Sequence, residues 1–286
     1  MSDVAAIHDL VQKRTALKKE IAKIIVGQDA VIDQIVLSIF SGGHALLVGV
    51  PGLAKTLMVN TLAQALGLDF KRIQFTPDLM PSDVIGTAVF SPKTTEFQFR
   101  KGPIFGNIVL VDEINRAPAK TQAALFEAME ERQVTVEGET RPLPDPFFVI
   151  ATQNPSHQIG TFPLPESQLD RFLMRIELGY PDRNAERALL VSGGQRAQAD
   201  QLMPLIEAGD LPSMQREAAA VHAAEPLIDY VQALVEAGTP FDALFAVCDP
   251  IALGALDELH ARGLSVPGQV GLHLLRVHPH AAWSGA

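Results

Sequence analysis

The sequence predicts an α/β fold in which helices flank a parallel sheet, followed by a smaller, mainly helical region. Short runs typical of buried parallel strands alternate with segments in which apolar residues have helical spacing. After Pro181 the composition changes, and residues 183–238 are rich in Ala, Leu, Glu and Gln without a strong strand candidate. We therefore expect an α/β core over residues 1–181 and a helical, lid-like region over residues 182–286.

Each expected element follows from the local pattern of apolar residues. The expected strands cover residues 45–48, 70–75, 108–111, 147–151 and 176–178. The expected helices cover residues 4–25, 29–40, 57–66 and 121–132. Residues 133–136 and 139–143 alternate around Glu137-Gly138, which predicts a short hairpin. The stretch 76–102 is polar and punctuated by prolines, so we expect a loop or a small insertion there.

The composition argues against several classes of protein. A formal net charge of −10 over 286 residues does not favour binding to nucleic acid by general electrostatics, and we expect no nucleic-acid partner. No apolar run approaches the roughly 20 residues that a bilayer span needs. The first ten residues lack the basic and then apolar pattern of a signal peptide. We therefore expect a cytoplasmic chain, with its single cysteine, Cys248, as a small core residue.

A phosphate-binding motif follows the first expected strand and opens a helix, which is the context that a P-loop requires. Small residues let backbone N–H groups point at phosphates, and the helix N-terminus adds the positive end of its dipole. Lys55 would neutralise the β- and γ-phosphates of ATP, and the Thr56 hydroxyl would ligate Mg²⁺. The alternative is a chance Gly-rich turn. The candidate nucleotide-binding residues are Gly49, Val50, Pro51, Gly52, Leu53, Ala54, Lys55, Thr56 and Leu57.

Two carboxylates follow the apolar strand at residues 108–111. Asp112 is placed to hold Mg²⁺, directly or through water, and Glu113 to orient and deprotonate the attacking water. The alternative is a strand that ends in solvated acids. A third strand runs into Asn154, whose amide could position that water beside the γ-phosphate, although an Asn before Pro155 is more often a turn former.

These residues resemble the AAA+ ATPases, and most closely the MoxR branch of that family. The resemblance covers about residues 5–190. The general P-loop motif has glycine at the position of Ala54, but alanine is usual at that position in this family. The strings that carry it are Ile25-Val-Gly-Gln28, Gly42-Gly-His44, Gly49–Thr56, Arg72–Leu79, Gly102–Phe105, Asp112-Glu-Ile-Asn-Arg116, Phe126–Glu131, Ala151–Pro155, Leu164-Pro-Glu166 and Leu169-Asp-Arg-Phe172.

The resemblance implies a hexameric ring with ATP at each subunit junction. By position, Asn154 is similar to the sensor-1 residue, and Arg171 to the arginine finger that reaches a neighbour's γ-phosphate. Arg175 is the rival candidate, and Arg171 could instead be an ordinary surface or ion-paired arginine. Residues 76–102 would be the helix-2 insertion, and the expected hairpin the insertion before sensor 1.

The C-terminal region departs from the family from about residue 239 onward. We find no string that carries the lid's sensor-2 arginine, and Arg276 is the remaining candidate. Residues 240–270 resemble part of the sugar-binding domain of LacI-type repressors. Asp249 matches a ligand-binding position there, but a helix N-cap is the preferred interpretation. We expect the histidines near the end to form a solvated tail rather than a metal site; they are His273, His278 and His280.

The resemblance implies a chaperone-like ATPase that remodels or matures a partner protein, with von Willebrand A proteins as candidate clients. The alternative, favoured by the unassigned sensor-2 arginine, is a nucleotide-gated binding module with little turnover. A DNA-acting AAA+ machine is disfavoured by the net charge of −10 and by the absence of a recognisable helix-turn-helix. A sugar-responsive regulator is the least supported hypothesis, because a segment of about 30 residues cannot build that whole domain.

Overall fold

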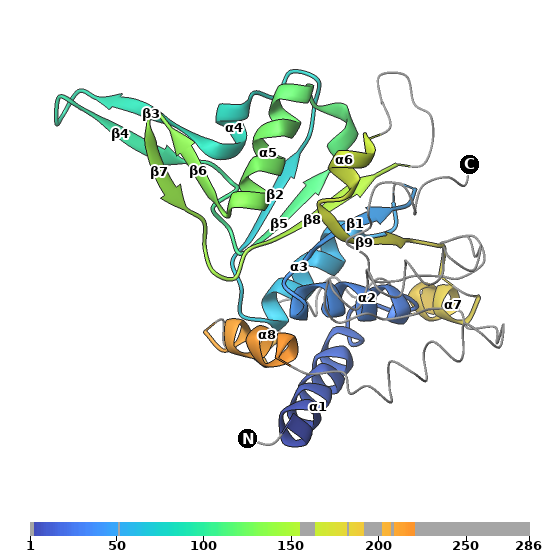
Figure 1. Cartoon of the computed structure of the whole chain (residues 1–286). Coiled ribbons are helices and arrows are strands. Elements are labelled where there is room, and N and C mark those ends of the chain that lie inside the picture. The colour runs from blue at the N-terminus through green and yellow to red at the C-terminus, as the bar shows by residue number, and fades with distance from the viewer. Residues whose placement is uncertain are drawn as a thin grey trace, which may run out of the picture.

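A five-stranded parallel sheet forms the centre of the molecule, as predicted (Figure 1). The computed structural model describes residues 3–50, 52–154, 164–181, 183–191, 202–206 and 209–220. Along the sheet the strand order is β2-β5-β8-β1-β9. The strands are β1 (His44–Val48), β2 (Phe70–Gln74), β5 (Ile108–Asp112), β8 (Phe148–Gln153) and β9 (Phe172–Glu177).

Both faces of the sheet are covered, which explains why its inner strands are buried and largely apolar. Alternate residues of a strand point to opposite faces. In β5, Ile108 and Leu110 enter one buried cluster, and Val109 and Val111 enter the other. The first cluster is shared with α1 (Asp3–Ile21), α2 (Asp29–Phe40), α3 (Lys55–Ala65) and α8 (Leu211–Ala219), and the second with α4 (Pro81–Ile85) and α5 (Ala119–Glu131).

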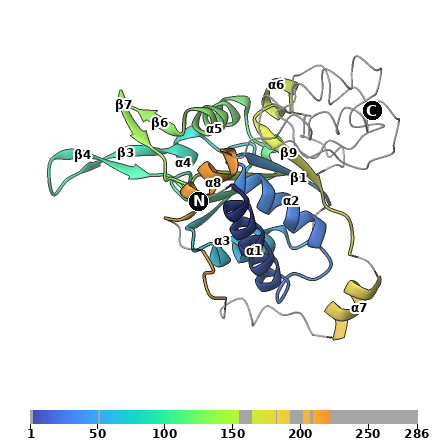
Figure 2. The same cartoon turned by 60° about the horizontal axis from the view of Figure 1, so that its bottom comes forward.

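The helices on the first face lie against one another as well as on the sheet. Helix α1 packs against α2, α3 and α8 (Figure 2), and its buried Leu17 and Ile21 belong to the shared cluster. None of the helices described is long and apolar enough to cross a membrane. The remaining helical segments are η1 (Ile114–Arg116), α6 (Glu166–Leu169) and α7 (Arg183–Val191).

Two antiparallel hairpins extend from the α/β core. The predicted hairpin is confirmed as β6 (Gln133–Val136) and β7 (Glu139–Pro142). Its two turn residues, Glu137 and Gly138, have φ values of 54° and 80°, as in a two-residue turn that matches the twist of the strands.

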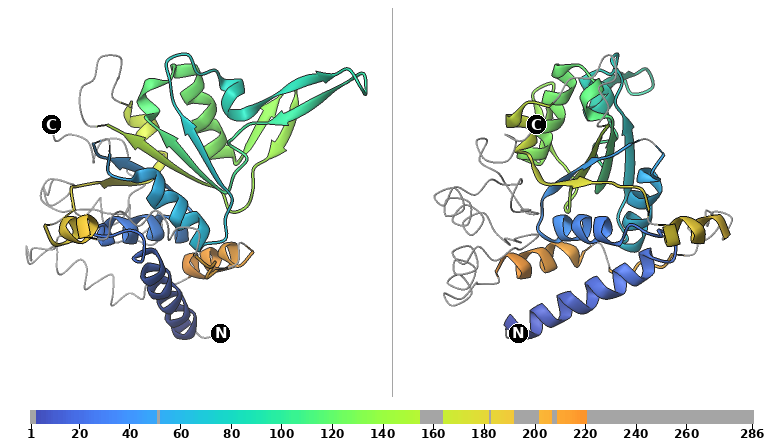
Figure 3. Two further views of the ribbon diagram at one scale, coloured as in Figure 1. Left: turned by 180° about the vertical axis from the view of Figure 1, so that it is seen from behind. Right: turned by 90° about the vertical axis from the view of Figure 1, so that its right-hand side faces the viewer.

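The stretch 76–102 is a small insertion with regular structure, so of the two alternatives predicted there the insertion is confirmed and the loop is wrong. It contains α4 and a hairpin of β3 (Gly86–Ser91) and β4 (Glu96–Lys101), which projects away from the sheet (Figure 3). Its prolines do not interrupt the strands. Pro81 is the first residue of α4, where its missing N–H costs nothing, and Pro92 follows the end of β3.

Strand β9 is longer than predicted for a physical reason. It lies at the edge of the sheet, where Phe172, Met174 and Ile176 are buried and the residues between them are more exposed. A search for a continuous apolar run therefore finds only its last residues. The other strands differ from prediction by one or two residues at their ends, and α1 ends at Ile21 instead of residue 25.

The described part of the expected lid region packs on the core. Ile206, Leu211 and Met214 belong to the cluster formed by α1, α2 and α3. The N–H of Leu205 donates to the Ala65 carbonyl at 2.9 Å, and Gln215 Nε2 donates to the Ile39 carbonyl at 2.7 Å. The boundary at residues 181/182 stays a prediction. The predictions for Cys248, Asp249, His273, Arg276, His278 and His280 lie outside the described residues.

Candidate nucleotide-binding site

The predicted site residues meet at the carboxyl ends of three adjacent strands. The Gly49–Thr56 loop follows β1, Asp112 ends β5, and Asn154 follows β8, which lies between those two strands. Ligands bind at this edge in open parallel sheets. A cavity of about 450 Å³, within the size range of small-molecule sites, lies there. Its lining comprises Gly49, Gly52, Leu53, Ala54, Lys55, Thr56, Leu57, Arg72, Gln74, Asp112, Glu113, Thr152 and Asn154.

The backbone of the loop explains its small residues. A Cβ on Gly49 would lie 2.8 Å from the Leu178 Cβ, so the close approach of the chain after β9 requires glycine. Gly52 has a φ of 92°. Ala54 also adopts the left-handed conformation, with a φ of 51°, which explains why the general motif has glycine there. Val50 does not line the cavity, and Pro51 lies outside the described residues.

Lys55 begins α3, and its side chain turns back over the loop. Its Nζ donates to the Gly49 carbonyl oxygen. Burial lowers the pKa of Lys55 below its ordinary value of 10.5, and the nearby carboxylates of Asp112 and Glu113 oppose that shift. The amine therefore lies close enough to both carboxylates to interact with them electrostatically, as one phosphate-binding site requires.

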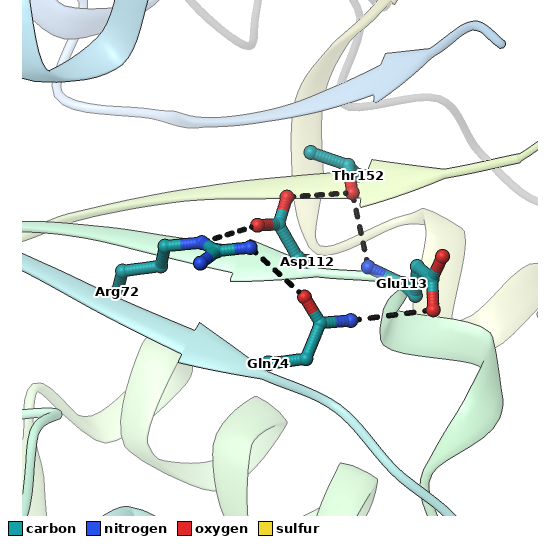
Figure 4. A network of polar contacts seen from close by, with 5 residues as sticks. All are labelled: Arg72, Gln74, Asp112, Glu113 and Thr152. Atoms are coloured by element: carbon teal, nitrogen blue, oxygen red, sulfur yellow. Dashed lines mark hydrogen bonds and ion pairs between the residues drawn. The ribbon is translucent and has the colours of Figure 1, made fainter. Parts of the chain in front are cut away.

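Asp112 is a buried carboxylate with a partner at each oxygen (Figure 4). Arg72 Nε donates to Oδ2 at 2.7 Å, and the Thr152 hydroxyl donates to Oδ1 at 3.2 Å. The same hydroxyl accepts a hydrogen bond from the Glu113 N–H at 3.0 Å. Thr152 thus links the backbone of one acidic residue to the side chain of the other.

Glu113 has a strained backbone and a paired side chain. Its φ of 56° and ψ of 50° are left-handed, a conformation that non-glycine residues adopt mainly where surrounding structure holds them. Its Oε2 accepts hydrogen bonds from Arg116 Nη1 at 2.6 Å and Gln74 Nε2 at 3.2 Å. The carboxylate is therefore held in place in a residue that lines the same cavity as Lys55.

The residues present fit a magnesium ion bound together with a nucleotide. Mg²⁺ prefers oxygen ligands and is usually held by one or two protein side chains plus substrate phosphates and water. The Thr56 hydroxyl and the Asp112 carboxylate supply such oxygens within one cavity. In the described part of the chain no three His, Cys, Asp or Glu side chains gather into a metal-binding group. An ion held by protein ligands alone does not fit these residues.

Comparison with known proteins identifies the family. A family model described as "ATPase family associated with various cellular activities (AAA)" matches residues 44–174. A crystal structure of a candidate ATPase from Cytophaga hutchinsonii is 40% identical, with a TM-score of 0.71 over 92% of this chain and 82% of that one. The protein named MoxR from Methylorubrum extorquens is 33% identical over 82% of this chain and 71% of its own length. The chain belongs to the MoxR-type AAA+ ATPases.

A second MoxR relative is more similar in sequence. Chaperone MoxR1 from Mycobacterium tuberculosis is 47% identical over 83% of this chain, which spans 60% of the length of that relative. The comparisons do not support the predicted likeness of residues 240–270 to LacI-type repressors, and that segment lies outside the described residues. The predicted MoxR-type likeness is therefore confirmed, and the LacI-like part of the sequence-based interpretation is not supported.

Arg171 does not join the MoxR-type nucleotide site of its own chain. It lies just before β9 and forms an ion pair with Glu130, at the opposite end of the strands. It lines a second cavity, of about 470 Å³, together with His44 at the start of β1 and Arg132 after α5. The rival candidate, Arg175, lies within β9 and pairs with Glu177 at 3.3 Å.

Arg72, Gln74 and Thr152 line the nucleotide cavity but were not singled out as site residues from the sequence. Arg72 and Gln74 lie two residues apart on β2, and therefore on one face of that strand. The register places Gln74 beside Asp112. The sequence shows polar residues at alternate positions of β2, but it does not show that this strand pairs with β5.

Proposed function

We propose that this chain binds MgATP and hydrolyses it. The observation that carries the proposal is that a P-loop, a lysine at its end and two carboxylates line one cavity at the ends of adjacent strands. Membership of the MoxR-type AAA+ ATPases supports the same activity, because it is the activity after which the matched family is named.

Each residue has a distinct role in the proposed reaction. The N–H groups of the Gly49–Thr56 loop and the Lys55 ammonium bind the phosphates. Thr56 and Asp112 hold Mg²⁺, which neutralises charge on the phosphate oxygens. Glu113 accepts a proton from the attacking water, and Asn154, which lines the same cavity, orients that water.

We also propose that the chain works as a ring, hexameric by resemblance, in which Arg171 acts on the nucleotide of a neighbouring subunit. Arg171 lines a different cavity from the P-loop, and its side chain is 41% exposed. That position supports an action outside its own subunit. A guanidinium there would stabilise the charge that develops on the transferred phosphoryl group.

The proposed output of hydrolysis is the remodelling or maturation of a protein client in the cytoplasm. The support is the relative named chaperone MoxR1, which is 47% identical to this chain. A von Willebrand A protein is the candidate client that the resemblance suggests. A purified client should raise the rate of ATP hydrolysis.

Steady-state ATPase assays of the wild type and of Glu113→Gln, with nucleotide binding measured on both, test the proposal. We expect the wild type to turn over, and Glu113→Gln to bind ATP and lose at least about 100-fold in kcat, because it cannot accept the proton. If both proteins bind ATP and neither hydrolyses it, the chain is a nucleotide-gated binding module, and the proposed catalysis is wrong.

A complementation assay tests the role of Arg171. We expect Arg171→Ala to bind ATP but lose about 1,000-fold in kcat, and Arg175→Ala to lose far less. Mixing Arg171→Ala with Lys55→Met, each inactive alone, should restore hydrolysis where an intact loop meets an intact Arg171. Mixed assemblies that form and stay inactive would show that Arg171 does not act across the subunit boundary.

A further inference from the structure

Strand β2 places an arginine beside a carboxylate inside the nucleotide cavity. Arg72 Nε lies 2.7 Å from Asp112 Oδ2, and its Nη2 donates to Gln74 Oε1 at 3.0 Å (Figure 4). The Arg72 side chain is 49% exposed and lines the cavity, whereas the side chain of Asp112 is only 11% exposed. One contact thus joins the guanidinium to the buried carboxylate that would serve the metal, and the contact with Gln74 holds it there.

The buried Asp112 carboxylate needs a positively charged partner when it is ionised. A buried carboxylate without a partner is costly, and a guanidinium is the side chain that best supplies both charge and hydrogen bonds. The oxygen that Arg72 contacts belongs to the same carboxylate as the proposed metal ligand. Arg72 and a cation therefore compete for one negative group.

We propose that Arg72 is a positioning residue that supplies the positive charge at Asp112 when Mg²⁺ does not. This inference rests on the proposed binding of MgATP. The presence of Arg72 then determines how much the affinity for the nucleotide differs with and without Mg²⁺. With Arg72 present, the negative triphosphate of metal-free ATP meets an Asp112 that is paired with a guanidinium. Without Arg72, Asp112 keeps only the Thr152 hydroxyl and the nearby Lys55 amine, and its less compensated charge repels the triphosphate more strongly.

The ratio of two dissociation constants measures this effect directly. The first constant is taken with EDTA and the second with excess Mg²⁺, both for a fluorescent ATP analogue that cannot be hydrolysed. In Arg72→Gln, which loses the charge but keeps an amide donor, we expect binding in EDTA to weaken about fivefold. We expect binding with Mg²⁺ to hold or tighten, because the ion no longer competes with a guanidinium. The ratio should therefore rise at least about fivefold.

Two further variants isolate the charge. Arg72→Lys keeps a positive charge and should leave the ratio within about twofold of the wild type. Lys71→Gln is the matched control, because Lys71 precedes Arg72 on β2, is 45% exposed and pairs with Asp69 at 3.2 Å, away from the cavity lining. It removes the same charge from the opposite face of the strand and should not change the ratio.

An unchanged ratio in Arg72→Gln, or an equal rise in Lys71→Gln, would overturn the proposal. Equal weakening in EDTA and in Mg²⁺ would also overturn it, because Arg72 would then contact the nucleotide in both states. Failure of the wild type to bind the analogue under either condition would instead sink the proposed MgATP binding. Thermal unfolding of each variant confirms that it is folded.

Discussion

At the scale of single residues, one hydroxyl joins the two acidic residues of the site. Thr152 donates to Asp112 and accepts from the N–H of Glu113, which is held in a left-handed conformation. Thr152 is 3% exposed, so water does not easily replace these contacts. Thr152 therefore links the proposed metal-binding group to the residue that is proposed to activate water.

Thr152→Val should damage both stability and activity, because it leaves the Glu113 N–H and one Asp112 oxygen without this partner. We expect the free energy of unfolding to fall by about 1–3 kcal/mol and kcat to fall about tenfold. Thr152→Ser keeps the hydroxyl and should lose much less of both. Denaturant unfolding and ATPase rates check this, and equal losses in the two variants would show that the methyl group matters instead.

At the scale of elements, the β3–β4 hairpin depends on a tight closure at its base. A Cβ on Gly102 would lie 2.2 Å from the Val84 carbonyl oxygen and 2.6 Å from the Gly86 nitrogen. These contacts are with backbone atoms of α4 and of the start of β3, which cannot move aside as a flexible side chain does. The insertion is thus anchored to α4 by close backbone packing.

Gly102→Ala should therefore force the base of the hairpin apart. We expect a loss of about 1–3 kcal/mol in the free energy of unfolding, in the range of overpacked sites. Gly179→Ala is the matched control, because no atom lies within 4 Å of the position that its Cβ would take. A Gly102→Ala protein as stable as the control would contradict the described closure.

Sequence-based prediction was accurate where the signal is local and inaccurate where the structure depends on contacts between distant segments. The P-loop, Asp112 and Glu113 were predicted because an apolar strand and the residues directly after it are local signals. Arg72 was missed as a site residue because its role depends on the register of β2 against β5, which no local pattern contains. Strand β9 was predicted too short because buried and more exposed residues alternate along this edge strand. The β3–β4 hairpin was missed because its exposed faces carry few core residues.

At the scale of the whole molecule, helix α8 closes the core from a distant part of the sequence. Leu211 is fully buried and Met214 is 2% exposed, among residues of α1, α2 and α3. The sequence predicts a helical region here but not the surface that it covers. This packing ties the chain after residue 202 to the helix that follows the P-loop.

Met214→Ala should lower the stability of the whole core, not only that of α8. We expect a loss of about 2–4 kcal/mol in the free energy of unfolding, as for other buried methionines. Met203→Ala removes the same atoms from a side chain that is 74% exposed and should change little. Both values come from denaturant unfolding without nucleotide, and similar losses in the two variants would contradict the packing of α8.

Calorimetric titration of MgATP into the wild type and into Lys55→Met tests the central claim most directly. Because burial lowers the pKa of Lys55, folding disfavours the charged amine, and stability rises with pH between the lowered value and 10.5. Methionine removes that charge but also the hydrogen bond to the Gly49 carbonyl, so thermal unfolding of both proteins is measured to separate lost binding from lost folding. We predict that the wild type binds one MgATP per chain and that Lys55→Met binds at least about 100-fold more weakly. Equal affinity in the two proteins, or no binding by the wild type, would contradict the assignment of the Gly49–Thr56 loop as the nucleotide site.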